Sequence, residues 1–294
     1  MKIDLPAAPR GPRSYIIIDI ESAVMDDIGH RRYLAMERWS PRSDDQPSRR
    51  GYQRHEDPLK TPRWVFQRVV TASVMRLAEH PDGNVEIAAF DTFTAPDHDE
   101  RGVIAGVLQA LHDAPKGTEL VSWGGAMHDL PVLLGAVLRH KLTLPHDWRW
   151  MAFGGDGRVH HVDFARVLTG GFKMKPIHQS EYAAALDIPA KLTAAPFMVT
   201  KLIDQGRWDM VAEICEGDVI TGAFLLIRWR RLFDDRAEVD AAEDRLLRQI
   251  CDLKPDRGYV VALQARRATR FAAQLTQAAN DAAVLAPWLD SEAA

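Results

Sequence analysis

A short apolar run near the start of the chain ends in two carboxylates, and this arrangement limits what the chain can fold into. Residues 14–23 read SYIIIDIESA, so Asp19 and Glu21 close a run of isoleucines. The run predicts a buried strand, and side-chain alternation places Asp19 and Glu21 on the same face. Two carboxylates side by side at a buried strand end repel each other, so we expect a divalent cation to neutralise them. The alternative is a strand that ends in a solvated acidic turn.

Another carboxylate follows a second predicted strand and a pair of glycines. Residues 119–123 (ELVSW) predict the strand, Gly124 and Gly125 interrupt it, and a helix is expected to start near His128. Asp129 then falls in the first helical turn, where the helix dipole alone would stabilise a carboxylate. However, glycines permit close approach of a ligand, and sites in α/β sheets form at the carboxyl ends of strands. Asp129 is therefore a second candidate site residue.

A third carboxylate lies inside an apolar helical pattern. Apolar positions recur at helical spacing in residues 209–229, and Asp218 falls in the middle of their stripe, with Glu213 and Glu216 on the flanks and back. An unpaired carboxylate on a core-facing stripe costs on the order of several kcal/mol. We therefore expect Asp218 to bind a metal ion. The alternative is an ion pair with an arginine inside the protein.

The order of the remaining patterns predicts an α/β fold. A hairpin is expected from residues 64–78 and 85–93, which flank an Asp-Gly turn. Helical patterns follow at about 98–113, 207–231, 236–252 and 258–285. Strands come first, strands and helices alternate next, and helices come last. This order predicts a mixed sheet flanked by helices, with an α-helical C-terminal extension.

Composition restricts the class of protein. Residues 1–14 predict a flexible lead-in, and the polar segment at about 25–63 predicts a long surface insertion with little regular structure. The chain has neither an apolar run of membrane-spanning length nor the apolar core of a signal peptide, so a cytoplasmic protein without a membrane partner is expected. The net charge of −4 requires that any nucleic acid bind through a local basic surface or through metal ions.

Several motifs occur in an order found in a known superfamily. YIIIDIES is similar to an apolar D-x-E strand, SWGGAMHDLPVL to S-F-N-G-x-x-F-D-L-P-V-L, and ICEGDVIT to Y-C-E-x-D-V-x-x-T. HHVDFARVL and LDIPAKL are similar to its H-x-D and G-L-P-G-K segments. Over about residues 15–231 the chain thus resembles the DEDD superfamily of 3′–5′ exonucleases. The closest likeness is to predicted exonucleases related to the proofreading domain of family-B DNA polymerases.

The resemblance implies a fold, a cofactor and a set of site residues. The fold is a ribonuclease-H-like sheet, with the exonuclease domain over residues 15–231 and a C-terminal helical extension over residues 232–294. The cofactor is a pair of Mg²⁺ or Mn²⁺ ions, which activate water and stabilise charge on the attacking and leaving oxygens. The implied metal-binding and catalytic carboxylates are Asp19, Glu21, Asp129 and Asp218. Candidates for contact with the substrate are Ser22, Trp123, Gly124 and Gly125.

The chain departs from the family at two positions, one of which the resemblance assigns to orienting the attacking water. Ile214 stands in place of the tyrosine four residues before the last aspartate, and His128 in place of the phenylalanine of the second motif. We expect Ile214 to border the metal site. His128 is a candidate for positioning the attacking water, and the alternative is a histidine that packs at the helix start.

The predicted function is hydrolysis of phosphodiester bonds at the 3′ ends of nucleic acid, with single-stranded DNA as the expected substrate. The departures keep a second hypothesis open. It is a catalytically weak nucleic-acid-binding or scaffolding protein that retains the exonuclease fold.

Overall fold

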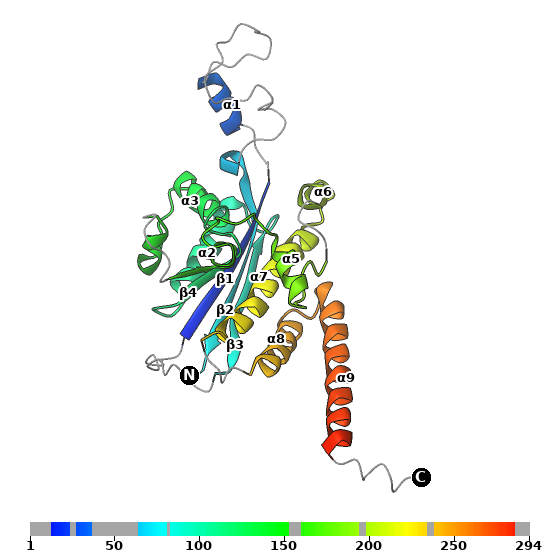
Figure 1. Ribbon diagram of the computed structural model, residues 1–294. Coiled ribbons are helices and arrows are strands. Elements are labelled where there is room, and N and C mark those ends of the chain that lie inside the picture. Colours follow the sequence, from blue (N-terminus) through cyan, green and yellow to red (C-terminus); the bar gives the residue numbers. More distant parts are fainter. Residues whose placement is uncertain are drawn as a thin grey trace.

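The centre of the protein is a five-stranded mixed sheet (Figure 1). The computed structural model describes residues 13–23, 28–36, 64–80, 83–152, 160–193, 198–233 and 238–285. The sheet has the order β3-β2-β1-β4-β5 and consists of β1 (Arg13–Ala23), β2 (Arg68–Glu79), β3 (Val85–Thr94), β4 (Glu119–Ser122) and β5 (His161–Asp163). β1, β2 and β3 pair antiparallel, whereas β4 and β5 run parallel to β1. This is the ribonuclease-H-like α/β arrangement that the sequence predicts.

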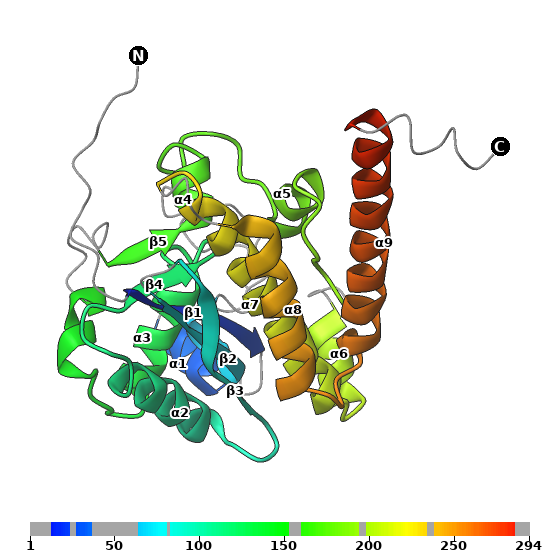
Figure 2. The same ribbon diagram turned by 90° about the horizontal axis from the view of Figure 1, so that it is seen from below.

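Helices cover both faces of the sheet (Figure 2). The isoleucines at even positions of β1 pack with α2 (Glu100–His112) and α3 (Asp129–Arg139). Tyr15 and Ile17 face the other side and pack with α7 (Trp208–Arg230). The contact with α7 is close, because a Cβ atom added at Gly222 would lie 3.1 Å from Cγ2 of Ile17. The alternation in β1 therefore turns Asp19 and Glu21 towards α7.

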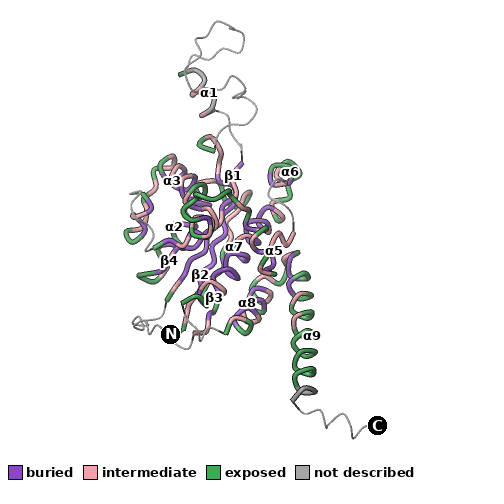
Figure 3. Tube along the Cα trace, in the orientation of Figure 1, coloured by how far each residue is buried: buried purple, intermediate pink, exposed green. Residues whose placement is uncertain are grey.

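The C-terminal part is helical, as the sequence predicts. α8 (Val239–Leu253) packs with α7 in the same core as β3, and α9 (Tyr259–Leu285) follows. Only the first part of α9 is packed, where Tyr259, Val260 and Leu263 are buried. Its side chains from residue 271 to residue 281 are all exposed, and Figure 3 shows this part of α9 standing clear of the body. The long helices begin and end within three residues of their predicted bounds.

Short helices fill the connections. They are α1 (Ile28–Met36), α4 (Phe164–Leu168), α5 (Gln179–Ala185), α6 (Val199–Asp204) and two 3₁₀ turns, Trp64–Phe66 and His146–Ala152. α1 falls inside the segment 25–63, for which the sequence predicts little regular structure; its residues IGHRRYLAM carry little apolar period. The remainder of that segment and residues 1–12 of the predicted lead-in lie outside the described residues. None of the helices in the described ranges combines the length and the apolar character needed to cross a bilayer.

Candidate active site

Three of the four predicted carboxylates meet between β1 and α7. Asp19, Glu21 and Asp218 each offer an oxygen atom, and these atoms lie within 4.8 Å of one another. The pairing of β1 with β2 shifts register between Glu21 and Ser22, a bulge of the kind that re-aims side chains beside sites. The Sγ atom of Cys215 donates a hydrogen bond of 3.2 Å to the backbone oxygen of Asp19, which fixes α7 against β1 at this point.

Asp129, the fourth predicted carboxylate, lies beside this group but is not part of it. It is the first residue of α3 and is 8% exposed. Its charge contributes to raising the pKa values of Asp19 and Glu21. The four carboxylates therefore share one electrostatic environment.

Burial and mutual repulsion raise the pKa values of these groups. Loss of contact with water, followed by the charges of Asp218, Asp129 and Glu21, raises the pKa of Asp19 well above its usual range. Burial and Asp218 raise the pKa of Glu21 to about 8. Burial and the charge of Asp163 raise the pKa of Asp129 to about 7. A cluster of carboxylate oxygens with this much uncompensated repulsion suits Mg²⁺ or Mn²⁺, which are hard cations that prefer oxygen ligands.

Lys191 is a cation of the site that the sequence analysis did not identify. Its Nζ atom lies 2.7 Å from each of the two carboxylate oxygens of Asp218. Burial raises the pKa of Asp218, and Lys191 opposes that rise. An ion pair of Asp218 was the predicted alternative to a metal, but the partner is a lysine rather than an arginine. The available signal was the segment LDIPAKL, in which Lys191 matches the lysine of the family's G-L-P-G-K segment.

The glycine pair forms a tight turn that Asp163 holds in place. Asp163 is 1% exposed and accepts hydrogen bonds from the backbone N–H groups of Gly124, Ala126 and Arg166 at 2.8, 3.0 and 3.2 Å. Gly124 has a φ of +73°, which favours glycine. Asp163 belongs to the H-x-D segment, for which the sequence alone indicates no role. In the structure it positions the loop that precedes Asp129.

A second contact closes the same turn. The Ser122 hydroxyl accepts a hydrogen bond of 3.2 Å from the N–H of Gly125 and lies 2.8 Å from Nε2 of His161. A Cβ atom at Gly125 would lie 2.4 Å from the Ser122 Oγ atom and 3.3 Å from Oδ2 of Asp129. The N–H groups of both glycines are thus occupied within the protein. A ligand can therefore approach the backbone of this turn closely, but these two N–H groups do not donate hydrogen bonds to it.

The other predicted contact residues lie around the site with different environments. The Ser22 hydroxyl donates to Oε1 of Gln67 at 2.8 Å. The Trp123 ring lies 5.9 Å from the ring of Tyr182 on α5. His128 precedes α3 without capping it through its side chain, and it is exposed.

Two residues of α7 that precede Asp218 are buried. Ile214 is 3% exposed and packs in an apolar cluster with Ala23, Val70 and Leu202. Glu216 was expected on the flank or back of the helix, but it is completely buried. The reason is that α7 is covered on both sides, by the sheet and by α8 and the start of α9.

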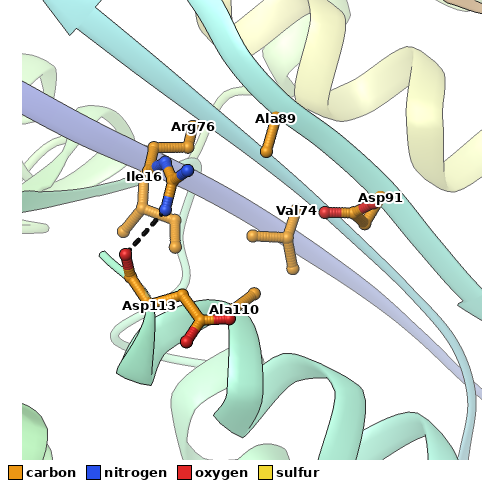
Figure 4. Close-up of a pocket in the computed structure, with 7 residues that line it drawn as sticks. All are labelled: Ile16, Val74, Arg76, Ala89, Asp91, Ala110 and Asp113. Atoms are coloured by element: carbon orange, nitrogen blue, oxygen red, sulfur yellow. Dashed lines mark hydrogen bonds between the residues drawn. The ribbon is translucent and has the colours of Figure 1, made fainter. Parts of the chain in front are cut away.

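Two hollows near the sheet lie away from the carboxylates. Figure 4 shows a cavity of about 90 Å³ between α2 and the strands, lined by Ile16, Val74 and Arg76, among others. Ile16 faces the opposite side of the sheet from Asp19. A hollow of about 410 Å³ lies beside Trp148 and Thr118, before the start of β4. The carboxylate cluster is instead a partly open arrangement of side chains at the edge where β1 and β4 end.

The geometry agrees with a sequence family. Residues 61–251 match the family described as "Predicted 3'-5' exonuclease related to the exonuclease domain of PolB". The chain belongs to this family. The match includes Asp129, Asp163, Lys191 and Asp218, whereas Asp19 and Glu21 precede it.

Other comparisons place this PolB-related exonuclease among distant structures. No curated protein sequence matches the chain. The family B DNA polymerase from Pyrobaculum calidifontis is 17% identical, with a TM-score of 0.45 over 87% of this chain and 29% of the polymerase. E. coli Exonuclease I in complex with a dT13 oligonucleotide is 11% identical, with a TM-score of 0.39 over 76% of this chain and 43% of the enzyme. The chain therefore spans less than half the length of either protein.

Proposed function

We propose that the protein is a metal-dependent 3′–5′ exonuclease that hydrolyses phosphodiester bonds at the 3′ ends of nucleic acid. The observation that carries this proposal is the group formed by Asp19, Glu21 and Asp218, whose oxygen atoms lie within 4.8 Å of one another. These residues, with Asp129, would hold two Mg²⁺ or Mn²⁺ ions. Such ions supply charge stabilisation for the attacking and leaving oxygens of phosphodiester hydrolysis.

The chain's own residues have separate tasks in this proposal. Asp163 and Ser122 hold the turn at Gly124 and Gly125, which brings Asp129 to the carboxylates. The same turn lets the end of the nucleic-acid strand approach closely. Because His128 is exposed beside Asp129, it is the candidate to accept a proton from the attacking water. Trp123, at the end of β4, offers a face on which the terminal base can stack.

Single-stranded DNA is the proposed substrate. A catalytically weak nucleic-acid-binding or scaffolding protein is the other hypothesis, and it rests on Ile214 in place of a tyrosine. The carboxylate cluster and the family membership do not favour it.

The test is cleavage of labelled oligonucleotides. Purified protein is incubated with 3′- and 5′-labelled DNA and RNA strands in Mn²⁺, in Mg²⁺ and in chelator. We expect shortening from the 3′ end that requires the metal and is lost in Asp19→Asn. The matched control is Asp91→Asn, which makes the same chemical change at an exposed position of β3 and should leave activity unchanged. Cleavage that persists in chelator, or in Asp19→Asn, would exclude the proposal.

A further inference from the structure

The loop between α4 and α5 presents apolar and basic side chains to solvent. Phe172 is 38% exposed and Met174 is 65% exposed, and Lys173 and Lys175 beside them are exposed too. No aspartate or glutamate occurs from residue 164 to residue 180. The loop is therefore a local positive surface on a chain whose net charge is −4.

Both ends of this loop are anchored at the carboxylate site. At the start of α4, Asp163 accepts a hydrogen bond of 2.8 Å from the backbone N–H of Gly124. At the start of α5, the side-chain amide of Gln179 donates to the backbone oxygen of Asp218 at 3.1 Å. α4 has only five residues and spans about 7 Å, so the loop starts one short helix after Asp163, and it ends at Gln179.

The loop is held in one conformation by its own hydrogen bonds. The backbone N–H groups of Lys173 and Met174 both donate to the backbone oxygen of Thr169 at 3.1 Å, and the N–H of Phe172 donates to the Thr169 hydroxyl at 3.2 Å. Phe172 has a φ of +64°, which a residue with a bulky side chain rarely adopts. Such conformations cluster at functional sites, and here the strain holds an aromatic ring at the surface.

The charges of the loop are also available. Neither Lys173 nor Lys175 forms an ion pair with any residue in the described ranges. Another acid-free stretch, in α9, differs in this respect. Its Arg266, Arg267 and Arg270 pair with carboxylates at 3.0, 2.7 and 2.7 Å.

We propose that residues 172–175 form a platform for an unpaired nucleic-acid strand as it approaches the carboxylates. Phe172 would stack on a base, and Lys173 and Lys175 would contact phosphates. An aromatic ring between lysines suits a single strand, because every base has a face for stacking and every linkage has a charge. This inference rests on the proposed function, and it adds a binding surface outside the carboxylate cluster.

Binding in chelator tests the platform without turnover. The measurement is the fluorescence anisotropy of three labelled ligands: a 12-nucleotide oligo(dT), a 12-nucleotide oligo(rU) and a blunt duplex. The first two distinguish binding of DNA from binding of RNA. Phe172→Gly removes the ring and keeps a residue suited to a positive φ, and Phe172→Tyr restores the ring. Phe271→Ala, at an exposed position of α9, is the matched control.

The expected result for Phe172→Gly is weaker single-strand binding by about 5- to 150-fold, with Phe172→Tyr close to the wild type. Replacing Lys173 and Lys175 together with glutamine should reduce the slope of log K against log salt by about 1.4. Lys116→Gln, an exposed lysine before β4, should leave that slope unchanged. Binding of Phe172→Gly within twofold of the wild type, or an equal loss for the blunt duplex, would overturn the platform.

A small substrate separates this result from the proposed function. Hydrolysis of the p-nitrophenyl ester of thymidine monophosphate needs the carboxylates. The ester itself is too small to need the loop for binding. Phe172→Gly should hydrolyse it at the wild-type rate in Mn²⁺. If the wild type fails to hydrolyse the ester and the oligonucleotides, the proposed function fails, while the binding measurement still decides the platform.

Discussion

The hydroxyl of Tyr259 donates a hydrogen bond of 2.9 Å to Glu216, a carboxylate that is completely buried. Glu216 also accepts from the hydroxyl of Thr92 at 2.7 Å and pairs with Arg257 at 2.8 Å. It lies two residues before Asp218, which corresponds to a helical rotation of about 200°, so the two side chains point to nearly opposite sides of α7. The first residue of α9 thus contacts the side of α7 that faces away from Asp218 and the carboxylate cluster.

Tyr259→Phe should destabilise the protein by about 1.5–3 kcal/mol, because it removes a hydrogen bond to a buried charged acceptor. Urea unfolding measures the change. Tyr182→Phe is the control, since the Tyr182 hydroxyl forms no hydrogen bond within the described part of the chain. A loss below about 0.5 kcal/mol for Tyr259→Phe would mean that the other partners of Glu216 suffice.

In chelator, stability should fall as pH rises from about 4 to about 8. Folded Glu21 and Asp129 keep their protons up to pKa values of about 8 and about 7, whereas the unfolded chain releases them near pH 4. The folded state therefore binds more protons in this window, and deprotonation favours unfolding by a few kcal/mol, in order of magnitude. Millimolar Mn²⁺ should raise the melting temperature most at the alkaline end.

Two aspartate variants provide the control for this pH dependence. Asp19 has only carboxylates as charged neighbours, so Asp19→Asn should flatten the curve in chelator. Asp218→Asn should flatten it too, because the charge of Asp218 contributes to raising the pKa values of Asp19, Glu21 and Asp129. An unchanged slope in both variants would contradict the shared electrostatic environment of the four carboxylates.

Lys191→Met should bind Mn²⁺ more tightly than the wild type, by about tenfold. The ammonium holds both oxygens of Asp218 at 2.7 Å, so it competes with a cation for this ligand. Removing one unfavourable charge contact of about 1.4 kcal/mol gives the tenfold estimate. Calorimetric titration measures the affinity, with Lys201→Met on the exposed side of α6 as control. Weaker binding in Lys191→Met would show instead that Lys191 holds Asp218 in the shape that a metal requires.

Gly125→Ala and Gly135→Ala should change stability in opposite directions. A methyl group at Gly125 would meet the Ser122 Oγ atom at 2.4 Å, so the turn must shift and carry Asp129 with it. Gly135 lies in α3 with nothing within 4 Å of an added Cβ atom, and alanine there should stabilise the helix by up to about 1 kcal/mol. Thermal unfolding and Mn²⁺ titration of both variants make the comparison. Unchanged metal affinity in Gly125→Ala would separate the turn from the site.

Ile214→Tyr should lower stability by about 1–3 kcal/mol without raising the rate of cleavage. The side chain is 3% exposed, so a phenol has neither space nor access to the attacking water. Ile214→Val, which only removes a methylene group, should cost about 0.5–1.5 kcal/mol. A clear gain in rate for Ile214→Tyr would show that the cluster around it opens towards the carboxylates.

Local periodicity explains which parts of the site could be predicted. Asp19 and Glu21 follow from alternation along one strand, and Asp218 from the spacing of one helix. Lys191 lies in an irregular segment, and its pairing with Asp218 spans 27 residues, so periodicity does not reveal it and only the match to the family's G-L-P-G-K segment points to it.

Local periodicity does not reveal that a helix is buried on more than one side. The stripe of α7 indicates one buried face, but α8 and α9 cover a second, and Glu216 lies there. Asp163 was similarly hidden, because its partners are backbone N–H groups up to 39 residues away, which no side-chain pattern reports.

The placement of β1 at the centre of the sheet has a consequence for biosynthesis. This strand precedes every other described helix and strand along the chain, yet Asp19 contacts Cys215 across 196 residues. Contacts of such long range make folding slow, and domains of this size tend to pass through partly folded intermediates. No nascent chain that stops short of α7 can assemble the carboxylate cluster. The carboxylate cluster can therefore form only after the chain has been translated beyond Asp218.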